Sequence, residues 1–202
     1  YNLTVLDALG CTAEVEATIR QPAELFVNVG PDRLIQLGFD TIVSAFSNYS
    51  PVTYEWSPAD SLRCLNMDCS TVEVNPTSTT TYTVTVINAN GCEATRTVTI
   101  RVIKDRPVYI PNVFSPNLDG YNDGFTIFGG RALEKIEKLQ VFSRWGSLVF
   151  EATDIDPNDE LLGWDGTFNG RPVDQGVFVY LAQLRFVDQE VVQVEGDVTL
   201  IR

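Results

Sequence analysis

The sequence contains no histidine, few basic residues and no long apolar run. Histidine is the commonest general base and transition-metal ligand, so its absence weighs against enzymes and metalloproteins. The 14 lysine and arginine residues face 27 aspartate and glutamate residues, which gives a formal charge of −13. Phosphate binding needs clustered positive charge, so we expect no nucleic-acid partner. No segment approaches the roughly 18 apolar residues of a membrane-spanning helix.

The four cysteines, Cys11, Cys64, Cys69 and Cys92, favour a disulfide over a metal site. Cys64 and Cys69 bracket four residues, and a disulfide could close this short loop. A structural zinc site needs four ligands together, and the chain supplies neither histidine nor a second close cysteine pair. Free buried thiols are the alternative. A disulfide would place the protein in an oxidising compartment outside the cytoplasm.

Residues 1–20 are repeated at residues 82–101, where ten positions are identical. Both copies alternate threonine and valine around a turn that contains glycine, a pattern typical of stacked β-sandwich modules. We therefore expect residues 1–20 to be the last hairpin of one immunoglobulin-like repeat, and residues 21–105 to be the next repeat. The abrupt opening YNLTVLDALGC agrees with a fragment of a longer protein.

Residues 21–105 contain six short β-branched segments separated by glycine, proline, asparagine or serine, at 34–38, 40–47, 53–58, 70–76, 81–88 and 95–102. Six or seven strands in this length suit an immunoglobulin-like sandwich. Trp56 lies in an alternating segment, and we expect it to plug the core between two sheets. A sugar-stacking platform is the alternative for Trp56.

The second half, residues 106–202, has strand patterns of its own after two prolines interrupt the first half's pattern. Alternating segments at 139–152, 176–187 and 197–202 are typical of antiparallel strands. Apolar residues spaced by three within 132–139 predict a single helical turn there. The predicted fold class is all-β, with two tandem antiparallel β-sandwich domains that pack independently.

Residues 112–125, NVFSPNLDGYNDGF, mix oxygen-bearing side chains with glycines, which suits either a calcium loop or tight turns. Counted as an EF-hand from Ser115, the twelfth residue is Thr126 where a bidentate glutamate belongs. A partial calcium site would use Asn117, Asp119, Asn122 and Asp123. The alternative is a pair of turns in which Asn117, Asp119 and Asn122 accept backbone N–H groups.

Four ordered blocks in the second half carry a family resemblance: IPNVFSPNLDGYNDGF, LQVFSRWGSLVFE, WDGTFNGRPVDQGVFVY and GDVTLIR. Through them, residues 107–202 resemble the gliding-motility-associated C-terminal domain, also called CHU_C or the type B sorting domain. Such domains end surface proteins exported by the type IX secretion system of Bacteroidota. The first half resembles the PKD-like or immunoglobulin-like repeats that often precede them, through NVGPDRLIQLG, YEWSP, CLNMDC, TTTYTVTV and NANGC.

The resemblance implies a compact β-sandwich that serves as an address and performs no chemistry. It implies partners in the outer membrane, barrel proteins of the PorV-like and SprF-like kinds, and a location on the cell surface. The sorting-motif residues it implies are Pro116, Asn117, Asp119, Gly120, Asn122, Asp123, Arg144, Trp145, Gly146, Trp164, Asp165, Gly166, Asn169 and Gly170. The whole protein would be an adhesin or filament-like protein, with the repeat as a stalk beside neighbouring immunoglobulin-like repeats.

Two departures from the family pattern affect these expectations. Leu118 stands where the sorting family usually has the first glycine of PNGDG. Gln36 stands where relatives of the repeat often have a cysteine that could pair with Cys92. We therefore expect Cys92 to be a buried free thiol.

Individual roles within the motif follow from residue type. We expect Trp145 and Trp164 to anchor the core, and Asp165 and Asn169, each before a glycine, to form turns. Arg144 should pair with a carboxylate or stack on an aromatic ring, or else contact the export machinery.

Two other classes of function remain open. A carbohydrate-binding accessory module of an extracellular hydrolase would present a planar row of aromatic residues, with Tyr121, Phe125 and Phe168 as candidates. A polymerising fibre subunit would present complementary edge strands.

Overall fold

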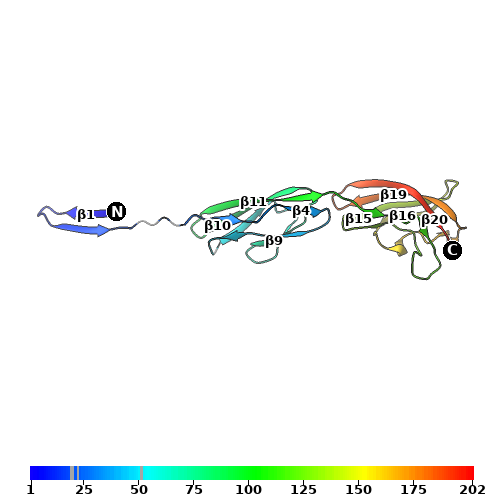
Figure 1. Ribbon diagram of the computed structural model, residues 1–202, viewed down its shortest axis with the longest axis horizontal. Coiled ribbons are helices and arrows are strands. Elements are labelled where there is room, and N and C mark those ends of the chain that lie inside the picture. The colour runs from blue at the N-terminus through cyan, green and yellow to red at the C-terminus, as the bar shows by residue number, and fades with distance from the viewer. Residues whose placement is uncertain (19–20, 22, 51) are drawn as a thin grey trace.

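The computed structural model describes residues 1–18, 21, 23–50 and 52–202, and it is all-β. A hairpin, an immunoglobulin-like domain and a C-terminal domain follow one another along the long axis (Figure 1). The described residues form one short 3-10 helix and no α-helix, and none of their helices is long and apolar enough to cross a membrane. The prediction of an all-β chain with two sandwich-like halves is confirmed.

The N-terminal hairpin consists of β1 (Asn2–Leu6) and β2 (Thr12–Glu16). Its turn has the same hydrogen bonds as the turn between β10 (Thr80–Asn88) and β11 (Glu93–Ile103). The side-chain oxygen of Asp7, or of Asn88, accepts the backbone N–H groups two and four residues further on, at 2.9–3.0 Å. The sequence repeat therefore corresponds to a repeated local structure. Repeat positions 19 and 20 lie outside the described residues.

The apolar face of this hairpin has no cover among the described residues. Leu3 and Val5 are exposed, whereas Val84 and Val86, at the equivalent positions of the second copy, are fully buried. The same sequence pattern thus forms a core face in the complete domain and an open face in the hairpin.

The immunoglobulin-like domain packs a four-stranded sheet against a three-stranded one. The larger sheet has the order β4-β11-β10-β7, the smaller β5-β9-β8, and β3 pairs with β6. The bounds not yet given are β3 (Val27–Asn28), β4 (Arg33–Gln36), β5 (Thr41–Ser44), β6 (Phe46–Ser47), β7 (Val52–Ser57), β8 (Leu62–Cys64) and β9 (Thr71–Val74). Trp56 is half-buried against this core, and its Nε1 donates to the Cys69 carbonyl oxygen at 2.8 Å.

The C-terminal domain is built on one five-stranded sheet of order β13-β20-β19-β15-β16. Short strand pairs, β12 with β14 and β17 with β18, and η1 complete it. The bounds are β12 (Val108–Tyr109), β13 (Val113–Phe114), β14 (Phe128–Gly129), β15 (Leu133–Phe142), β16 (Leu148–Ile155), η1 (Glu160–Leu162), β17 (Thr167–Phe168), β18 (Arg171–Pro172), β19 (Gly176–Phe186) and β20 (Val191–Leu200). β4 and β13 join their sheets in parallel, so the expected antiparallel pairing fails at these two edges.

The predicted helical turn at 132–139 is wrong, because these residues enter strand β15. The pairing of β15 with β19 shifts register twice, between Leu133 and Lys135 and between Ile136 and Lys138. Each such bulge inserts one residue and returns the next apolar side chain to the same face. Leu133, Ile136 and Leu139 are therefore all buried in a strand at a spacing of three.

The two domains do not pack independently, because the side chain of Leu37, the residue that follows β4 of the first domain, packs in the core of the second. Its side chain is 1% exposed and belongs to the hydrophobic cluster of the C-terminal domain. Gly38 follows with φ +81°, and a Cβ there would lie 2.6 Å from the Arg131 carbonyl oxygen. Only glycine allows this close approach of the two backbones.

Charged groups surround this contact. The Asp188 carboxylate, 5% exposed, lies 3.1 Å from Lys104 Nζ and 2.6 Å from Arg106 Nη2. Burial raises the pKa of Asp188, but the hydrogen bond from Lys104 and the charges of both cations lower it further than burial raises it. Arg131 lies 3.3 Å from Asp40 and over the Phe39 ring. The junction is thus a packed interface.

Candidate functional site

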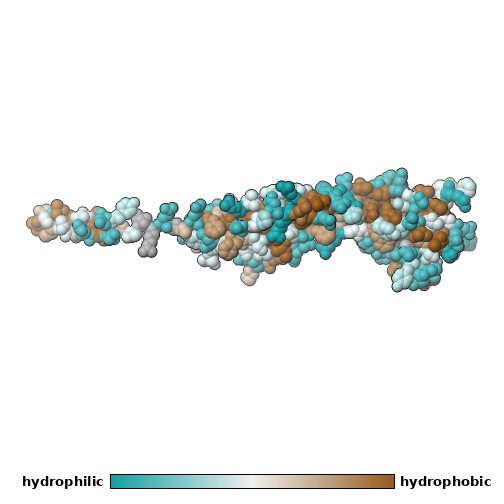
Figure 2. Space-filling view, viewed as in Figure 1, coloured by the Kyte–Doolittle hydropathy of each residue, from teal (hydrophilic) through white to brown (hydrophobic). Residues whose placement is uncertain are grey.

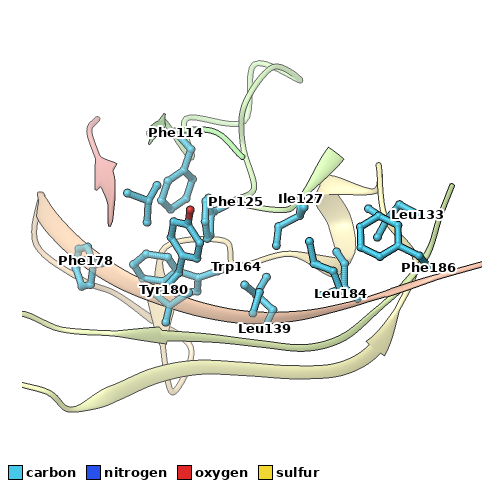
Figure 3. Packing of buried hydrophobic residues seen from close by; sticks show 14 of the residues in the cluster. Phe114, Phe125, Ile127, Leu133, Leu139, Trp164, Phe178, Tyr180, Leu184 and Phe186 are labelled. Atoms are coloured by element: carbon cyan, nitrogen blue, oxygen red, sulfur yellow. The ribbon is translucent and has the colours of Figure 1, made fainter. Parts of the chain in front are cut away.

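Three of the four motif blocks meet at one end of the C-terminal core. Phe125 and Trp164 exchange backbone hydrogen bonds of 2.8 and 2.9 Å. The Trp164 ring lies 5.2 Å from Phe114 and 4.7 Å from Phe178, centroid to centroid. Figure 3 shows these aromatic side chains gathered over the curved sheet, with Tyr180 among them. Segments far apart in the sequence therefore share one aromatic cluster.

Trp164 anchors this cluster as predicted, with a side chain that is 0% exposed. Its Nε1 donates to the Thr167 carbonyl oxygen at 2.8 Å, which satisfies the one polar atom of the ring. Asp165 accepts from the Thr167 backbone N–H at 2.9 Å and from its hydroxyl at 2.8 Å. Gly166 has φ +75°, and a Cβ there would lie 2.6 Å from Leu200 Cδ1. The Trp-Asp-Gly block therefore stabilises the packing of the C-terminal core.

The last residue joins the same end. Arg202 donates to the Val173 carbonyl oxygen at 2.6 Å and to the Gly166 carbonyl oxygen at 3.2 Å. Because Leu200 is also buried against Gly166, the final strand and the Trp-Asp-Gly loop hold one another in place.

Asn169 and Gly170 form a two-residue turn between β17 and β18. Both have positive φ, 52° and 72°, and the flanking residues Phe168 and Arg171 pair directly. This is the backbone geometry for which Asn-Gly is favoured in hairpins.

The loop that contains Asn117, Asp119 and Asp123 is held by turns. Asn117 Oδ1 accepts the Asp119 N–H, and Asp119 Oδ1 accepts the Tyr121 N–H, both at 2.9 Å. Asp123 accepts two backbone N–H groups, one at each carboxylate oxygen, at 2.6 and 2.8 Å. Asn122 contributes its backbone, with φ 54° and a carbonyl oxygen that accepts the Ser115 N–H.

The partial calcium site expected in this loop stays a prediction, because two of its four residues, Asn117 and Asn122, carry amide side chains. The described residues contain no group of three or more His, Cys, Asp or Glu side chains placed to hold a metal ion. Both carboxylate oxygens of Asp123 accept backbone N–H groups of the same loop, which is the kind of bonding that the turn alternative expects.

Trp145 differs from the prediction: it lies at the tip of the turn between β15 and β16 and is 84% exposed. Ser143 Oγ accepts the backbone N–H groups of Trp145 and Ser147 at 3.3 Å, so the tight turn points the ring away from the sheet. The Arg144 guanidinium lies 5.7 Å from the Trp145 ring centroid. Arg144 therefore stacks on an aromatic ring, which was one of its expected roles.

The cysteines divide into two kinds. Cys64 and Cys69 are joined by a disulfide in the immunoglobulin-like domain. Cys92 is free and exposed, so the prediction of a buried thiol is wrong. Position 92 lies just after a hairpin turn that projects from the sheet, and the preceding hairpin presents Cys11 in the same way.

The candidate aromatic residues for sugar binding do not form a row. Phe125 is fully buried in the aromatic cluster, while Tyr121 and Phe168 are exposed. The expected exposure of Phe125 is therefore wrong, and the carbohydrate-binding alternative loses one of its three residues.

Sequence reasoning missed the exposed apolar residues on the outer face of β19, Val177 and Val179. The signal was present in GVFVY, where apolar residues occupy both faces of one strand. A strand with one solvated face normally alternates apolar and polar residues.

Comparison with known proteins identifies the C-terminal domain. The family model of the CHU_C type IX secretion signal domain matches residues 108–200. Among curated proteins, none is significantly similar to this sequence.

The chain is also similar in structure to multidomain β-proteins. These include fibronectin(III)-like modules of Clostridium thermocellum CbhA (12% identity, 88% of this chain and 93% of that one, TM-score 0.29) and dimeric latent PorU from Porphyromonas gingivalis (13%, 99% and 23%, 0.30). A tetra-tandem repeat in the extending region of a large adhesion protein is a third (14%, 98% and 55%, 0.38). Similarities this low carry no argument about function.

The matched residues coincide with the five-stranded domain, and three of its four motif blocks meet at one end of its core. A domain of this kind implies a secreted or cell-surface protein that interacts with the type IX secretion machinery. Residues 108–200 are a CHU_C type IX secretion signal domain, preceded in this chain by a β domain of two main sheets.

Proposed function

We propose that the chain is the C-terminal part of a large adhesin or filament-like surface protein, and that outer-membrane barrel proteins recognise and bind its C-terminal domain. The observation that carries this proposal is the match of residues 108–200 to a secretion signal domain, three of whose four motif blocks meet at one end of the core. The partners would be a PorV-like shuttle and an SprF-like barrel.

The sorting-motif residues would divide their work between folding and contact. Trp164 is buried and would maintain the shape of the domain, while Arg144 and Trp145 project into solvent and are free to meet a partner. Recognition would use the folded surface, because a packed β-sandwich offers rigid loops and edges that a receptor can bind without chemistry.

The immunoglobulin-like domain would act as a spacer. Its junction with the signal domain is packed through Leu37 and ion-paired through Asp188, which suits a stiff connection. The hairpin at residues 1–16 repeats the β10–β11 hairpin and leaves its apolar face open. We therefore infer that it belongs to a neighbouring immunoglobulin-like repeat.

An export assay tests the proposal. A fluorescent cargo with a signal peptide for the inner membrane is fused to residues 1–202 and produced in a host with type IX secretion. We expect the cargo on the cell surface or in the medium, and we expect it in the periplasm when residues 107–202 are removed. Equal delivery of both fusions, or periplasmic retention of both, would refute the proposal.

A further inference from the structure

The outer face of the C-terminal sheet carries an exposed apolar strip at the end near Trp145. Five residues form this strip, which we call the outer strip: Phe142, Leu148, Val177, Val179 and Leu181. In the strand pairing Phe142 lies opposite both Leu148 and Val179, so the side chains are neighbours on one face. Leu148, Val177 and Val179 are exposed, and the other two are half-buried. Figure 2 shows hydrophobic side chains interrupting the hydrophilic surface of this domain.

A groove runs along the outer strip beside two carboxylates. Its volume is about 500 Å³, and one wall is apolar while the other is acidic. Val179 lies opposite Asp197, and Leu181 lies opposite Glu195, in the pairing of β19 with β20. The lining residues are Phe142, Val179, Tyr180, Leu181, Glu195, Gly196 and Asp197.

The two carboxylates lack cationic partners of their own. Among the ion pairs formed by described residues, none involves Glu195 or Asp197. At the other end of the same sheet the acids are neutralised, since Arg185 lies within 3.3 Å of Glu134 and within 3.0 Å of Glu137. The groove is therefore the part of this face where negative charge meets bare apolar surface.

The composition of the groove selects the kind of occupant. Lysine and arginine side chains can lay their aliphatic stems on apolar residues while their charged ends reach carboxylates. A second copy of this chain is a poor occupant, because each copy carries a formal charge of −13 and the copies repel. An anionic lipid surface is repelled for the same reason.

We propose that the outer strip and its acidic wall form the docking surface for a basic, apolar protein segment of the export machinery. The inference rests on the proposed function and adds which face is bound. The partner's cations meet Glu195 and Asp197, and its apolar side chains cover Val177 and Val179. Trp145 lies just beyond the strip, on the β15–β16 turn, and is also exposed.

Charge reversal in the full chain tests the docking surface. In the cargo fused to residues 1–202, the double variant Glu195→Lys/Asp197→Lys is compared with Glu55→Lys/Glu93→Lys. The control pair also replaces two exposed acids on strands, with the same change of net charge, but in the immunoglobulin-like domain. We expect surface delivery to fall about tenfold for the groove pair, equivalent to about 1.4 kcal/mol of lost binding, and to stay near wild type for the control pair.

A second variant separates binding from folding. Val177→Thr/Val179→Thr keeps β-branched side chains in the exposed strand positions and replaces one methyl group of each by a hydroxyl. We expect reduced delivery with an unchanged thermal unfolding midpoint. In the same host, a photo-crosslinking residue at position 179 should form an adduct with an export component, and the adduct should disappear in the Glu195→Lys/Asp197→Lys background.

The outcomes distinguish this inference from the proposed function. If the wild-type fusion is delivered and the groove variants are delivered equally well, the docking surface is refuted and the proposed function stands. If both charge-reversed pairs fail alike, the effect is one of net charge, and the docking surface is again refuted. If the wild-type fusion stays in the periplasm, the proposed function fails and the docking surface fails with it.

Discussion

Leu37→Ala should destabilise the C-terminal domain although position 37 lies in the immunoglobulin-like domain. The Leu37 side chain is 1% exposed and packs within the cluster that contains Leu133 and Phe186. Removing a fully buried leucine side chain costs about 2–5 kcal/mol, the lost transfer free energy plus the cavity left behind. We expect about 3 kcal/mol, because the cavity opens at a domain junction that can partly relax. A loss of this size leaves a typical domain folded.

Hydrogen exchange measured by mass spectrometry can locate the effect. Peptides from β19 report opening of the C-terminal core, and peptides from β10 report opening of the immunoglobulin-like core. In Leu37→Ala we expect the free energy of opening to fall for β19 and to change much less for β10. The control is Leu34→Ala, three residues earlier and 64% exposed, which should change stability by less than about 0.5 kcal/mol.

The result that would refute this reasoning is a loss of protection confined to β10. Leu37 would then contribute its packing energy to its own domain, and the junction would be a loose contact between separate units. Equal losses in both cores would instead indicate that the two domains open together.

Three further predictions concern single side chains. In urea unfolding, Trp164→Ala should lower the free energy of unfolding by about 3–5 kcal/mol, whereas Trp145→Ala should change it by less than about 0.5 kcal/mol. Equal effects of the two substitutions would contradict the buried position of Trp164 and the exposed position of Trp145. Asp188→Asn should cost about 2 kcal/mol near neutral pH, because it removes a carboxylate that accepts charged hydrogen bonds. The pKa of Asp188 lies below its ordinary value of 3.8, so its stabilisation is complete above that value and is lost as the pH falls through the lowered pKa. The prediction would be contradicted if the free energy of unfolding had the same dependence on acid pH in the wild type and in Asp188→Asn. Gly166→Ala should cost more than about 1 kcal/mol in the same assay, since it combines a positive φ with a clash against Leu200; an unchanged midpoint would show that the loop can shift freely.

Local patterns in the sequence were sufficient to predict several of the longer strands and the repeat. Alternation of apolar residues identified β10, β11, β19 and the last four residues of β20. The turns at Asp7 and Asn88 share their hydrogen bonds because the spacing around them is the same. Trp164 was predicted as a core residue from its residue type, since tryptophan buries a large apolar area when it packs in a core.

The features that were missed depend on contacts between distant segments. Leu37 resembles any other strand residue, and only the folded chain places it inside the neighbouring domain. The spacing of three in 132–139 is ambiguous between a helical turn and a bulged strand, and pairing with β19 decides it. Trp145 and Trp164 both belong to motif blocks, so residue type alone could not separate the exposed ring from the buried one.

The most direct test of the export function compares two hosts. A cargo fused to residues 1–202 is produced in a host with a working type IX translocon and in one whose translocon has been inactivated, and its accessibility to external protease is measured on intact cells. We predict that protease reaches the cargo in the first host and that the cargo is protected in the periplasm of the second. Equal accessibility in both hosts, or protection in both, would contradict the assignment of this domain as an export address.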